Sequence, residues 1–339
     1  MAAKRDILRI LEAAYPAEDG EVAWLERLSA AVRADSGIPN DGVFAQLYDA
    51  SSGDRCEFGL AGGSGVDDWV LHELFGKRFA AYYNENPELI RESFLSMSFS
   101  LSGEIPGAKK HTYLRRELDA AGIGEVVGIN ASSPSGRGVV VCLLVKKSLR
   151  LSDPTRVLFG RVAGHIAAAN RLRLRLAGRG GVRRVETADA VIDEGGRVAH
   201  ATRGARVPQA RAQLASAAVS LLRARRRPRG DHGERAAAAW KALVDARWSL
   251  VDHFERDGRR FLVAQRNDPE APSVDLLTVR ERQVVALAAV GRANKEIAYE
   301  LGIATSTVGV LLARAASRLG VRTRRDLAAA FLRRSARPR

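Results

Sequence analysis

The sequence predicts a multidomain α+β protein in which two mixed helix-and-strand units precede a basic helical unit. Short stretches that alternate apolar and polar residues occur in pairs over residues 1–177 and again over 178–272, as expected of antiparallel strands with one buried face. Residues 273–339 show helical spacing, capping pairs and glycine stops instead. A chain of 339 residues is long enough for two or three domains.

Residues 1–177 are expected to alternate helices with two strand pairs. The expected elements are helices over 4–14 and 21–35, strands over 43–48 and 56–60, helices over 66–81 and 87–97, strands over 125–131 and 138–146, and a helix over 153–176. Paired strands, a helical excursion and a long closing helix resemble the layout of a GAF-type sensor domain, and a PAS-type domain is the close alternative. The resemblance is one of layout, without a diagnostic motif.

The closing helix carries an apolar seam at three- and four-residue steps. Its members are Leu158, Val162, Ile166, Ala169, Leu172 and Leu176. Such a seam can pair with a second copy of the chain or pack against the helix's own sheet, and both remain open. His165 lies on this seam, where a core or interface histidine is expected rather than a metal ligand.

A cavity between sheet and helices of this unit would take an unidentified small-molecule or protein signal. The residues expected around it, most of them also core residues, are Tyr48, Phe58, Trp69, Phe75, Phe99, Tyr113 and Ile129. The glycines 59, 62, 63 and 65 are expected in a loop, because they lack the spacing of a dinucleotide-binding fold. The two cysteines, Cys56 and Cys142, are expected to be reduced core residues.

Residues 178–272 predict a smaller α+β unit. A hairpin with a Gly-Gly turn over 190–200 precedes a helix over 207–225, and Trp240 is expected on a further helix. Two alternating strands follow around residues 248–254 and 260–265. The hairpin has the form seen at the start of PAS-like domains, so a PAS-like unit is expected, with a linker over 267–273.

Residues 273–339 predict four helices. Thr278 and Glu281 have the spacing of a capping box, in which the threonine accepts a backbone N–H and the glutamate reaches back. Gly291 is expected to end the first helix, since glycine adopts the left-handed stop conformation at low cost. Asn294 is expected to cap a second helix over 295–301.

A tight turn at Gly302 leads to a third helix, expected over 306–319. One stripe of this helix should be buried, comprising Val308, Leu312, Ala315 and Leu319. Gly320 stops it, and Thr323 with Asp326 forms a second capping pair that opens a fourth helix. This unit is strongly basic, with 13 Lys and Arg against 4 Asp and Glu over 277–339, within a net charge of +15 for the chain. Such a charge favours a polyanionic partner.

These four helices resemble the LuxR-type (NarL/FixJ-type) helix-turn-helix family. The matching segments are Leu277-Thr278-x-Arg280-Glu281, Gly291-x-x-Asn294-Lys295-Glu296-Ile297-Ala298, Leu301-Gly302-Ile303, Thr307-Val308 and Leu319-Gly320-Val321-x-Thr323-Arg324. The resemblance implies that the third helix enters the major groove and that the fourth forms a dimer contact. The implied DNA-binding residues are Lys295, Thr305, Ser306, Thr307, Gly309, Val310, Ala313, Arg314, Arg318, Arg322 and Arg324. The implied dimer contacts are Leu327, Ala330 and Phe331.

The sequence departs from the family pattern on the third helix. Gly309 and Leu311 stand where the family usually has Lys and His, and Ala304 replaces the usual serine before the helix, so Thr305 or Ser306 is expected to supply the cap. Loss of a base-reading lysine removes about 1–3 kcal/mol of discrimination. A sequence-indifferent DNA- or nucleoid-binding protein is therefore the alternative to a sequence-specific regulator.

No catalytic or cofactor-binding pattern stands out. The sequence lacks a Gly-x-x-x-x-Gly-Lys-Ser/Thr loop, zinc-ligand spacing and the acidic pattern of a phosphoacceptor domain. It also lacks an apolar run near 18 residues and the apolar region of a signal peptide. We therefore expect a cytoplasmic, homodimeric transcription regulator that binds double-stranded DNA, with RNA polymerase as a further partner, and neither enzymatic activity nor a cofactor nor membrane attachment.

Overall fold

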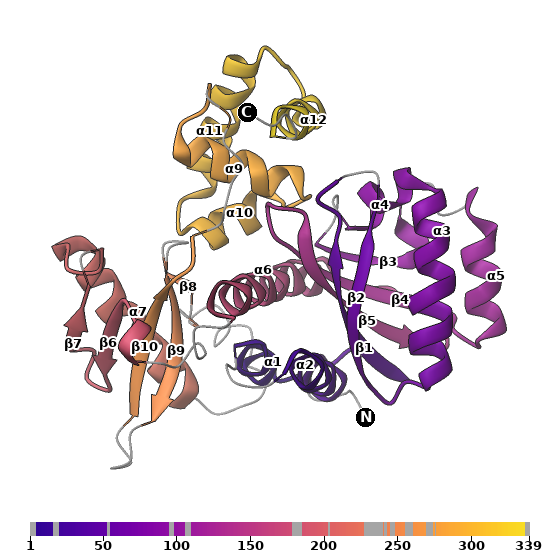
Figure 1. Cartoon of the computed structure of the whole chain (residues 1–339), viewed down its shortest axis with the longest axis horizontal. Coiled ribbons are helices and arrows are strands. Elements are labelled where there is room, and N and C mark those ends of the chain that lie inside the picture. Colours follow the sequence, from indigo (N-terminus) through magenta and orange to yellow (C-terminus); the bar gives the residue numbers. More distant parts are fainter. Residues whose placement is uncertain are drawn as a thin grey trace.

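The computed structural model describes most of the chain. The described residues are 5–15, 20–52, 55–94, 98–105, 110–177, 185–202, 204–226, 240, 243–244, 248–254, 260–268, 274 and 276–335. They form two antiparallel sheets with attendant helices and a separate helical unit, which lies above the long helix α6 (Asp153–Leu176) in Figure 1. No single helix among them is long and apolar enough to cross a bilayer.

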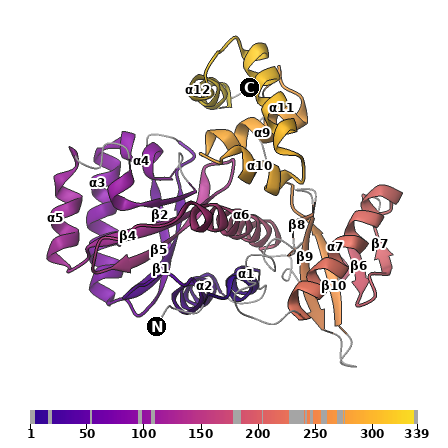
Figure 2. The same ribbon diagram turned by 180° about the vertical axis from the view of Figure 1, so that it is seen from behind.

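The first sheet has the strand order β2-β1-β5-β4-β3. Its strands are β1 (Gly42–Asp49), β2 (Glu57–Ser64), β3 (Phe99–Leu101), β4 (Glu125–Ser132) and β5 (Arg137–Val145). One face is covered by α6 together with α1 (Ile7–Ala14) and α2 (Glu21–Asp35). The other face is covered by a π-helix (Trp69–Phe79), α3 (Ala80–Glu85), α4 (Pro87–Phe94) and α5 (Thr112–Ala120). Alternate strand residues point to opposite sides of the sheet, so each face can bury its own set of helices; Figure 2 shows these helices from behind.

The helices and strands predicted for residues 1–177 agree with the structure, with three differences. It missed β3 and α5, and it assigned Gly59, Gly62 and Gly63 to a loop, whereas all three lie in β2. Gly62 is required there because β2 runs close beneath α2: a Cβ on Gly62 would lie 2.7 Å from the backbone nitrogen of Glu26. The hydroxyl of Ser29 donates to the Gly62 carbonyl at 2.8 Å across the same contact.

The second sheet repeats the strand order of the first, as β7-β6-β10-β9-β8. Its strands are β6 (Ala190–Asp193), β7 (Val198–Ala201), β8 (Leu243–Val244), β9 (Trp248–Phe254) and β10 (Arg260–Arg266), and α7 (Pro208–Arg226) packs on one face. The predicted hairpin, helix and strand pair are confirmed, with Gly196 at φ +82 in the hairpin turn. The helix predicted around Trp240, and the turn between β9 and β10, lie outside the described residues apart from Trp240 itself.

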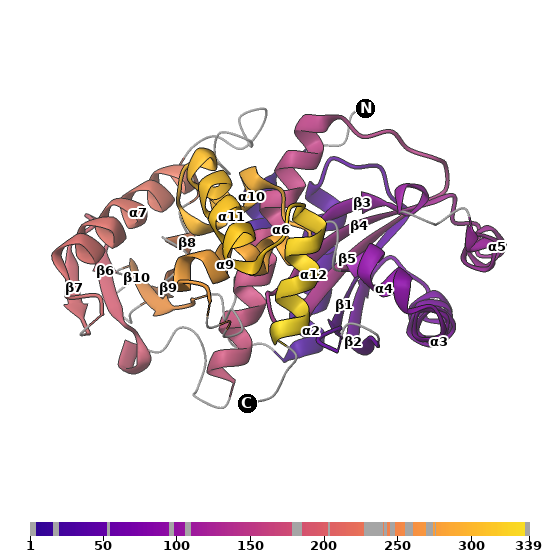
Figure 3. The ribbon, with the colours of Figure 1, turned by 90° about the horizontal axis from the view of Figure 1, so that it is seen from above.

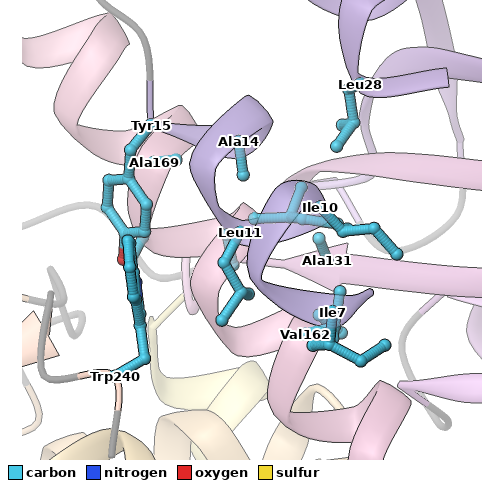
Figure 4. Packing of buried hydrophobic residues seen from close by; sticks show 14 of the residues in the cluster. Ile7, Ile10, Leu11, Ala14, Tyr15, Leu28, Ala131, Val162, Ala169 and Trp240 are labelled. Carbon is cyan, nitrogen blue, oxygen red and sulfur yellow. The ribbon is translucent and has the colours of Figure 1, made fainter. Parts of the chain in front are cut away.

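Helix α6 is buried along most of its length, because the two sheets, α1 and the C-terminal helices surround it (Figure 3). Its N-terminal half packs on the first sheet and on α1, where Ile10 and Val162 belong to one apolar cluster (Figure 4). Its C-terminal residues Leu172 and Leu176 pack against the second sheet. The seam predicted on this helix is therefore filled from within the chain, which is one of the two alternatives that the sequence left open.

Asn267, the first residue of the predicted linker, donates to the Ala168 carbonyl of α6 at 2.7 Å, and linker residues 269–273 lie outside the described residues. Beyond it, α9 (Val279–Ala289), α10 (Asn294–Leu301), α11 (Thr305–Leu319) and α12 (Arg324–Ser335) form the C-terminal helical unit. Its core consists of two adjoining apolar clusters, one centred on α9 and α12 and the other between α9, α10 and α11.

Helix α10 docks on α6. Gly160 and Gly164 of α6 allow the approach, because a Cβ on either would lie within about 3 Å of the Glu296 or Glu300 side chain. His165 is buried between the units, where one ring nitrogen pairs with the Tyr15 hydroxyl at 3.1 Å and the other with the Tyr299 hydroxyl at 2.7 Å. This confirms the prediction of a core or interface histidine.

Arg292, just before α10, joins the helical unit to the first sheet through hydrogen bonds. Its Nε donates to Glu300 at 2.8 Å, and its two terminal nitrogens donate to the Asn130 and Ser132 carbonyls of β4 at 3.0 and 3.3 Å. Both Arg292 and Glu300 are at most 2% exposed. A buried ion pair contributes stability only when further hydrogen bonds satisfy its remaining groups. Here the strand carbonyls satisfy the guanidinium, whereas Oε2 of Glu300 is buried without a hydrogen-bond partner among the described residues.

Truncation of Phe331, a fully buried residue of α12, should destabilise the helical unit. We expect Phe331→Ala to lower its free energy of unfolding by about 3–5 kcal/mol, because a large buried ring leaves a cavity. The neighbouring Leu332, 36% exposed, is the matched control, and Leu332→Ala should cost under about 1 kcal/mol. Urea unfolding followed by circular dichroism at two protein concentrations measures both. Equal losses for the two variants would contradict this assignment.

Enlargement of Gly160 should loosen the docking of α10. We expect Gly160→Leu to weaken this contact by about 1–3 kcal/mol through overpacking against Glu296. Amide hydrogen exchange should then accelerate in residues 292–301 but not in the first sheet. Val157→Leu, at a position of the same helix that is 37% exposed, is the control. Unchanged exchange in residues 292–301 of the Gly160 variant would show that the contact tolerates the side chain.

Candidate nucleic-acid interface

Helices α10 and α11 have the geometry of a helix-turn-helix. Their axes meet at 105° across a three-residue turn, within the range of about 90–120° that is usual for this motif. Gly302 ends α10 in the left-handed conformation, with φ of 63°. The turn is thus set by a glycine at the position where the sequence predicted it.

The helix starts differ in part from the prediction. The Thr278–Glu281 capping box is present, and Thr323 and Asp326 likewise bond each other at the start of α12. At α10, however, Ala293 holds the cap position, and its backbone N–H donates to Glu296 at 2.7 Å, so Asn294 is not the cap.

Helix α11 also starts without the predicted cap. Ala304 occupies its cap position, and no side chain makes the capping hydrogen bond, so Thr305 and Ser306 are not caps either. Their hydroxyls are exposed at the start of the helix instead. Two polar groups therefore remain available to a partner outside the chain.

The predicted reading face of α11 is open to solvent. Thr305, Ser306 and Thr307 are exposed on its first turn, Ala313 is exposed further along, and the Val310 side chain is 48% exposed. Gly309 lies between them with open space where a Cβ would stand. The structure therefore brings these predicted residues together on one surface.

Leu311, the second departure from the family pattern, lies on a different side of α11. It is half-buried and packs against the cluster that holds Ile297, Leu301 and Val308. Its apolar side chain extends the domain core, which accounts for a leucine at this position. Of Gly309 and Leu311, only Gly309 therefore removes a side chain from the reading face.

The predicted phosphate-binding cations divide into two groups. Lys295, Arg314 and Arg322 are exposed, on α10, on α11 and just after α11 respectively. Arg318 and Arg324 also have partners inside the chain: Arg318 donates to Glu281 at 2.8 Å, and Arg324 donates to Asn294 at 2.6 Å and to the Arg292 carbonyl. The Arg324 contacts connect α12 to the segment that docks on α6.

Glu281 has a structural role beneath these cations. Burial of its carboxyl would raise its pKa, but hydrogen bonds from Thr278 and the charge of Arg318 outweigh burial and hold the pKa below its usual value. The carboxylate is therefore ionised at neutral pH and fixes Arg318 beside the end of α11.

The residues predicted as dimer contacts are in the core of the helical unit. Leu327, Ala330 and Phe331 are at most 7% exposed and pack against α9. These side chains are covered within one chain, so a dimer contact through α12 would have to use its outer face.

A second candidate site is a cavity of about 550 Å³ between the first sheet and the helices α3 to α5. Of the residues predicted around it, Phe58 and Phe75 line it. The other five do not: Phe99 and Ile129 face α6, Tyr48 is buried beside the cavity, Tyr113 stacks on Tyr82, and Trp69 is 47% exposed. Cys56 and Cys142 are buried, as predicted for core residues, and Cys142 lies in the cavity wall.

Comparison with known families assigns the helical unit. Residues 275–331 match the family described as bacterial regulatory proteins of the LuxR family, a match that spans α9 to α11 and most of α12. No curated protein matches the chain. The C-terminal unit is thus a LuxR-type helix-turn-helix domain, which supports a DNA-binding transcriptional regulator.

Proposed function

We propose that this chain regulates transcription by inserting α11 into the major groove of a specific double-stranded DNA sequence. The observation that carries the proposal is the open face of α11, with three hydroxyl side chains at its start and exposed cations beside it. The major groove is about 12 Å wide, which matches the diameter of a helix with its side chains. Neutral and basic groups on that face suit base edges and phosphates respectively.

The side chains on this face indicate how a sequence would be read. The hydroxyls of Ser306 and Thr307 can donate to or accept from base edges, whereas Val310 and Ala313 suit contact with a thymine methyl group. Lys295, together with Arg314, would bind phosphates and set the orientation of the helix. Specificity would then depend on short side chains and close approach.

The two α+β units would supply sensing and dimerisation. Both sheets have the same strand order. Helix α6 packs on the first sheet, and α7 packs on the second. This arrangement supports a GAF-like unit at residues 1–177 and a PAS-like unit at 178–272. A homodimer would place two α11 helices about 34 Å apart on a pseudo-palindromic site. The chain would act by binding in the cytoplasm, with RNA polymerase as a further partner and without catalysis.

Gly309 favours a second candidate, a DNA-binding protein without sequence preference. It leaves a gap on the reading face where a lysine would reach a base or phosphate. Such a protein would bind all duplexes with similar affinity and a steep dependence on salt.

Selection of bound duplexes from a random library separates the two candidates. With the full chain at near-physiological salt, we expect enrichment of a pseudo-palindrome whose half-sites are about one helical turn apart. Tight binding without enrichment would favour the sequence-indifferent protein. Absence of binding under every salt condition would contradict both.

Replacement of Arg314 tests how α11 is oriented on DNA. We expect Arg314→Ala to weaken binding to every duplex and to reduce the slope of log affinity against log salt by about one unit, because one phosphate contact is lost. Fluorescence anisotropy over a salt series measures both. Arg197→Ala, at an exposed arginine in the turn between β6 and β7, should change neither. An unaltered slope for Arg314→Ala would place that side chain away from the phosphates.

A further inference from the structure

The cavity beside the first sheet has the dimensions of a ligand site. At about 550 Å³, it far exceeds the water-sized voids that well-packed cores tolerate, and it falls within the range of about 300–1,000 Å³ that is typical of small-molecule sites. Phe44, Val140 and Cys142 form its sheet wall, while Phe75 and Phe79 face them from the π-helix.

The lining of the cavity has an apolar interior and a basic rim. Aromatic and aliphatic side chains dominate the interior, and burial raises the pKa of the Cys142 thiol to about 12, so that group is neutral. On the rim, α5 contributes the exposed Arg115 and Arg116, with His111 just before it. No aspartate or glutamate is among the described residues that line the cavity.

We propose that this cavity binds a small aromatic carboxylate and that its occupancy is transmitted to the DNA-binding domain through Asn130 and Arg292. The apolar walls accept an aromatic ring, and the rim arginines offer hydrogen bonds to a carboxylate. Arg115 is already fixed by Asp119 and by the carbonyls of Ile123 and Gly124. Arg116 is therefore the rim cation assigned to the ligand.

Asn130 connects the cavity to the strand edge. Its side chain lies in the cavity wall and donates to the carbonyls of Ser93 and Phe94 in α4, both of which also line the cavity. The Tyr48 hydroxyl donates to its Oδ1 at 2.6 Å. A ligand that displaces α4 would therefore disturb this buried set of hydrogen bonds, which has few alternative partners.

Ser132 adds a second connection of the same kind. Its hydroxyl donates to the Phe94 carbonyl at 2.7 Å. Because strand residues two apart point their carbonyls in the same direction, Asn130 and Ser132 together present two acceptors at the edge of β4, beyond the short strand β3.

Arg292 of the helical domain donates hydrogen bonds to both carbonyl acceptors. A planar guanidinium fork matches two acceptors at fixed spacing, and an ammonium group does not. The same arginine holds Glu300 of α10, and its carbonyl accepts from Arg324 of α12. Val290, at the end of α9, belongs to the same apolar cluster as Tyr48 and Phe94. A shift of α4 or β4 would thus reach α9, α10 and α12.

The binding half of the proposal is tested with the full chain and benzoate, 1-naphthoate and anthracene-9-carboxylate as probes in isothermal titration calorimetry. We expect at least one to bind with 1:1 stoichiometry. Gly128 lines the cavity, and a Cβ there would stand 3.7 Å from its nearest neighbour, so Gly128→Leu should fill the space and weaken binding at least tenfold. Gly20→Leu, at a site with open space around it, should not. Absence of saturable binding, or equal binding by both variants, would overturn the site.

The charge of the ligand is tested at Arg116. Arg116→Gln should weaken binding of the carboxylate about tenfold, the value of one charge-assisted hydrogen bond, and change binding of the uncharged 1-naphthamide by less than about twofold. Arg197→Gln serves as the control for net charge. If carboxylate and amide bind equally well to the unaltered chain, the basic rim does not select the ligand and the carboxylate assignment is wrong.

The coupling half rests on the proposed DNA-binding function. Because linkage is reciprocal, saturating DNA should change the affinity for the bound carboxylate at least about fivefold in the unaltered chain. In Arg292→Lys, which keeps the charge but loses the fork, we expect less than a twofold change, with carboxylate affinity retained in the absence of DNA. A carboxylate affinity that DNA leaves unchanged in the unaltered chain would overturn the coupling. If the chain binds no DNA at all, the proposed function fails, whereas the calorimetry still decides the binding site.

Discussion

The arrangement of the whole chain depends on how closely α10 approaches α6. Helix α6 is already covered by α1, by the first sheet and, at its C-terminal end, by the second sheet. The remaining strip, at Gly160 and Gly164, is where the helical domain docks. Two glycines bring the helices together, and Arg292 compensates the charge and carbonyl groups that the contact buries. A docking surface built on buried hydrogen bonds tolerates few alternative geometries, so the domain has a defined orientation.

The docking contact and the proposed reading face lie on different sides of the helix-turn-helix. Glu296, Tyr299 and Glu300 of α10 face α6, whereas the hydroxyls at the start of α11 are exposed. The described residues of the N-terminal region therefore leave the proposed reading face exposed in this conformation. Its influence on DNA would act through the position and rigidity of the domain, since a signal changes affinity only when it favours one of two states.

The sequence predicted elements whose boundaries are encoded locally. Capping pairs and glycine stops located all four C-terminal helices, because those signals act within a few residues. The cap assignment at Asn294 was wrong because Ala293 holds the cap position and its N–H donates to Glu296. The assignment at Thr305 or Ser306 was wrong because Ala304 holds the cap position without a side-chain hydrogen bond. Strand β3 is three residues long and gives no periodic signal.

Arg292 resembles any surface arginine in sequence, and its role became visible only through contacts with residues about 160 positions away. The closest signal was a pair of glycines four residues apart, Gly160 and Gly164, beside His165 on the apolar seam of this helix.

Two of the three departures from the LuxR-type pattern, Leu311 and Gly309, have different physical meanings. Leu311 packs into the domain core, so it exchanges a polar side chain for apolar burial that stabilises the fold. Gly309 leaves open space where a Cβ would stand on the open face, which would let the backbone of α11 approach DNA more closely at that point. The hydroxyls of Ser306 and Thr307 are short, and they reach base edges only if the helix lies deep in the groove. The glycine and the short polar residues are therefore consistent with one another and with a reading face that depends on close backbone approach.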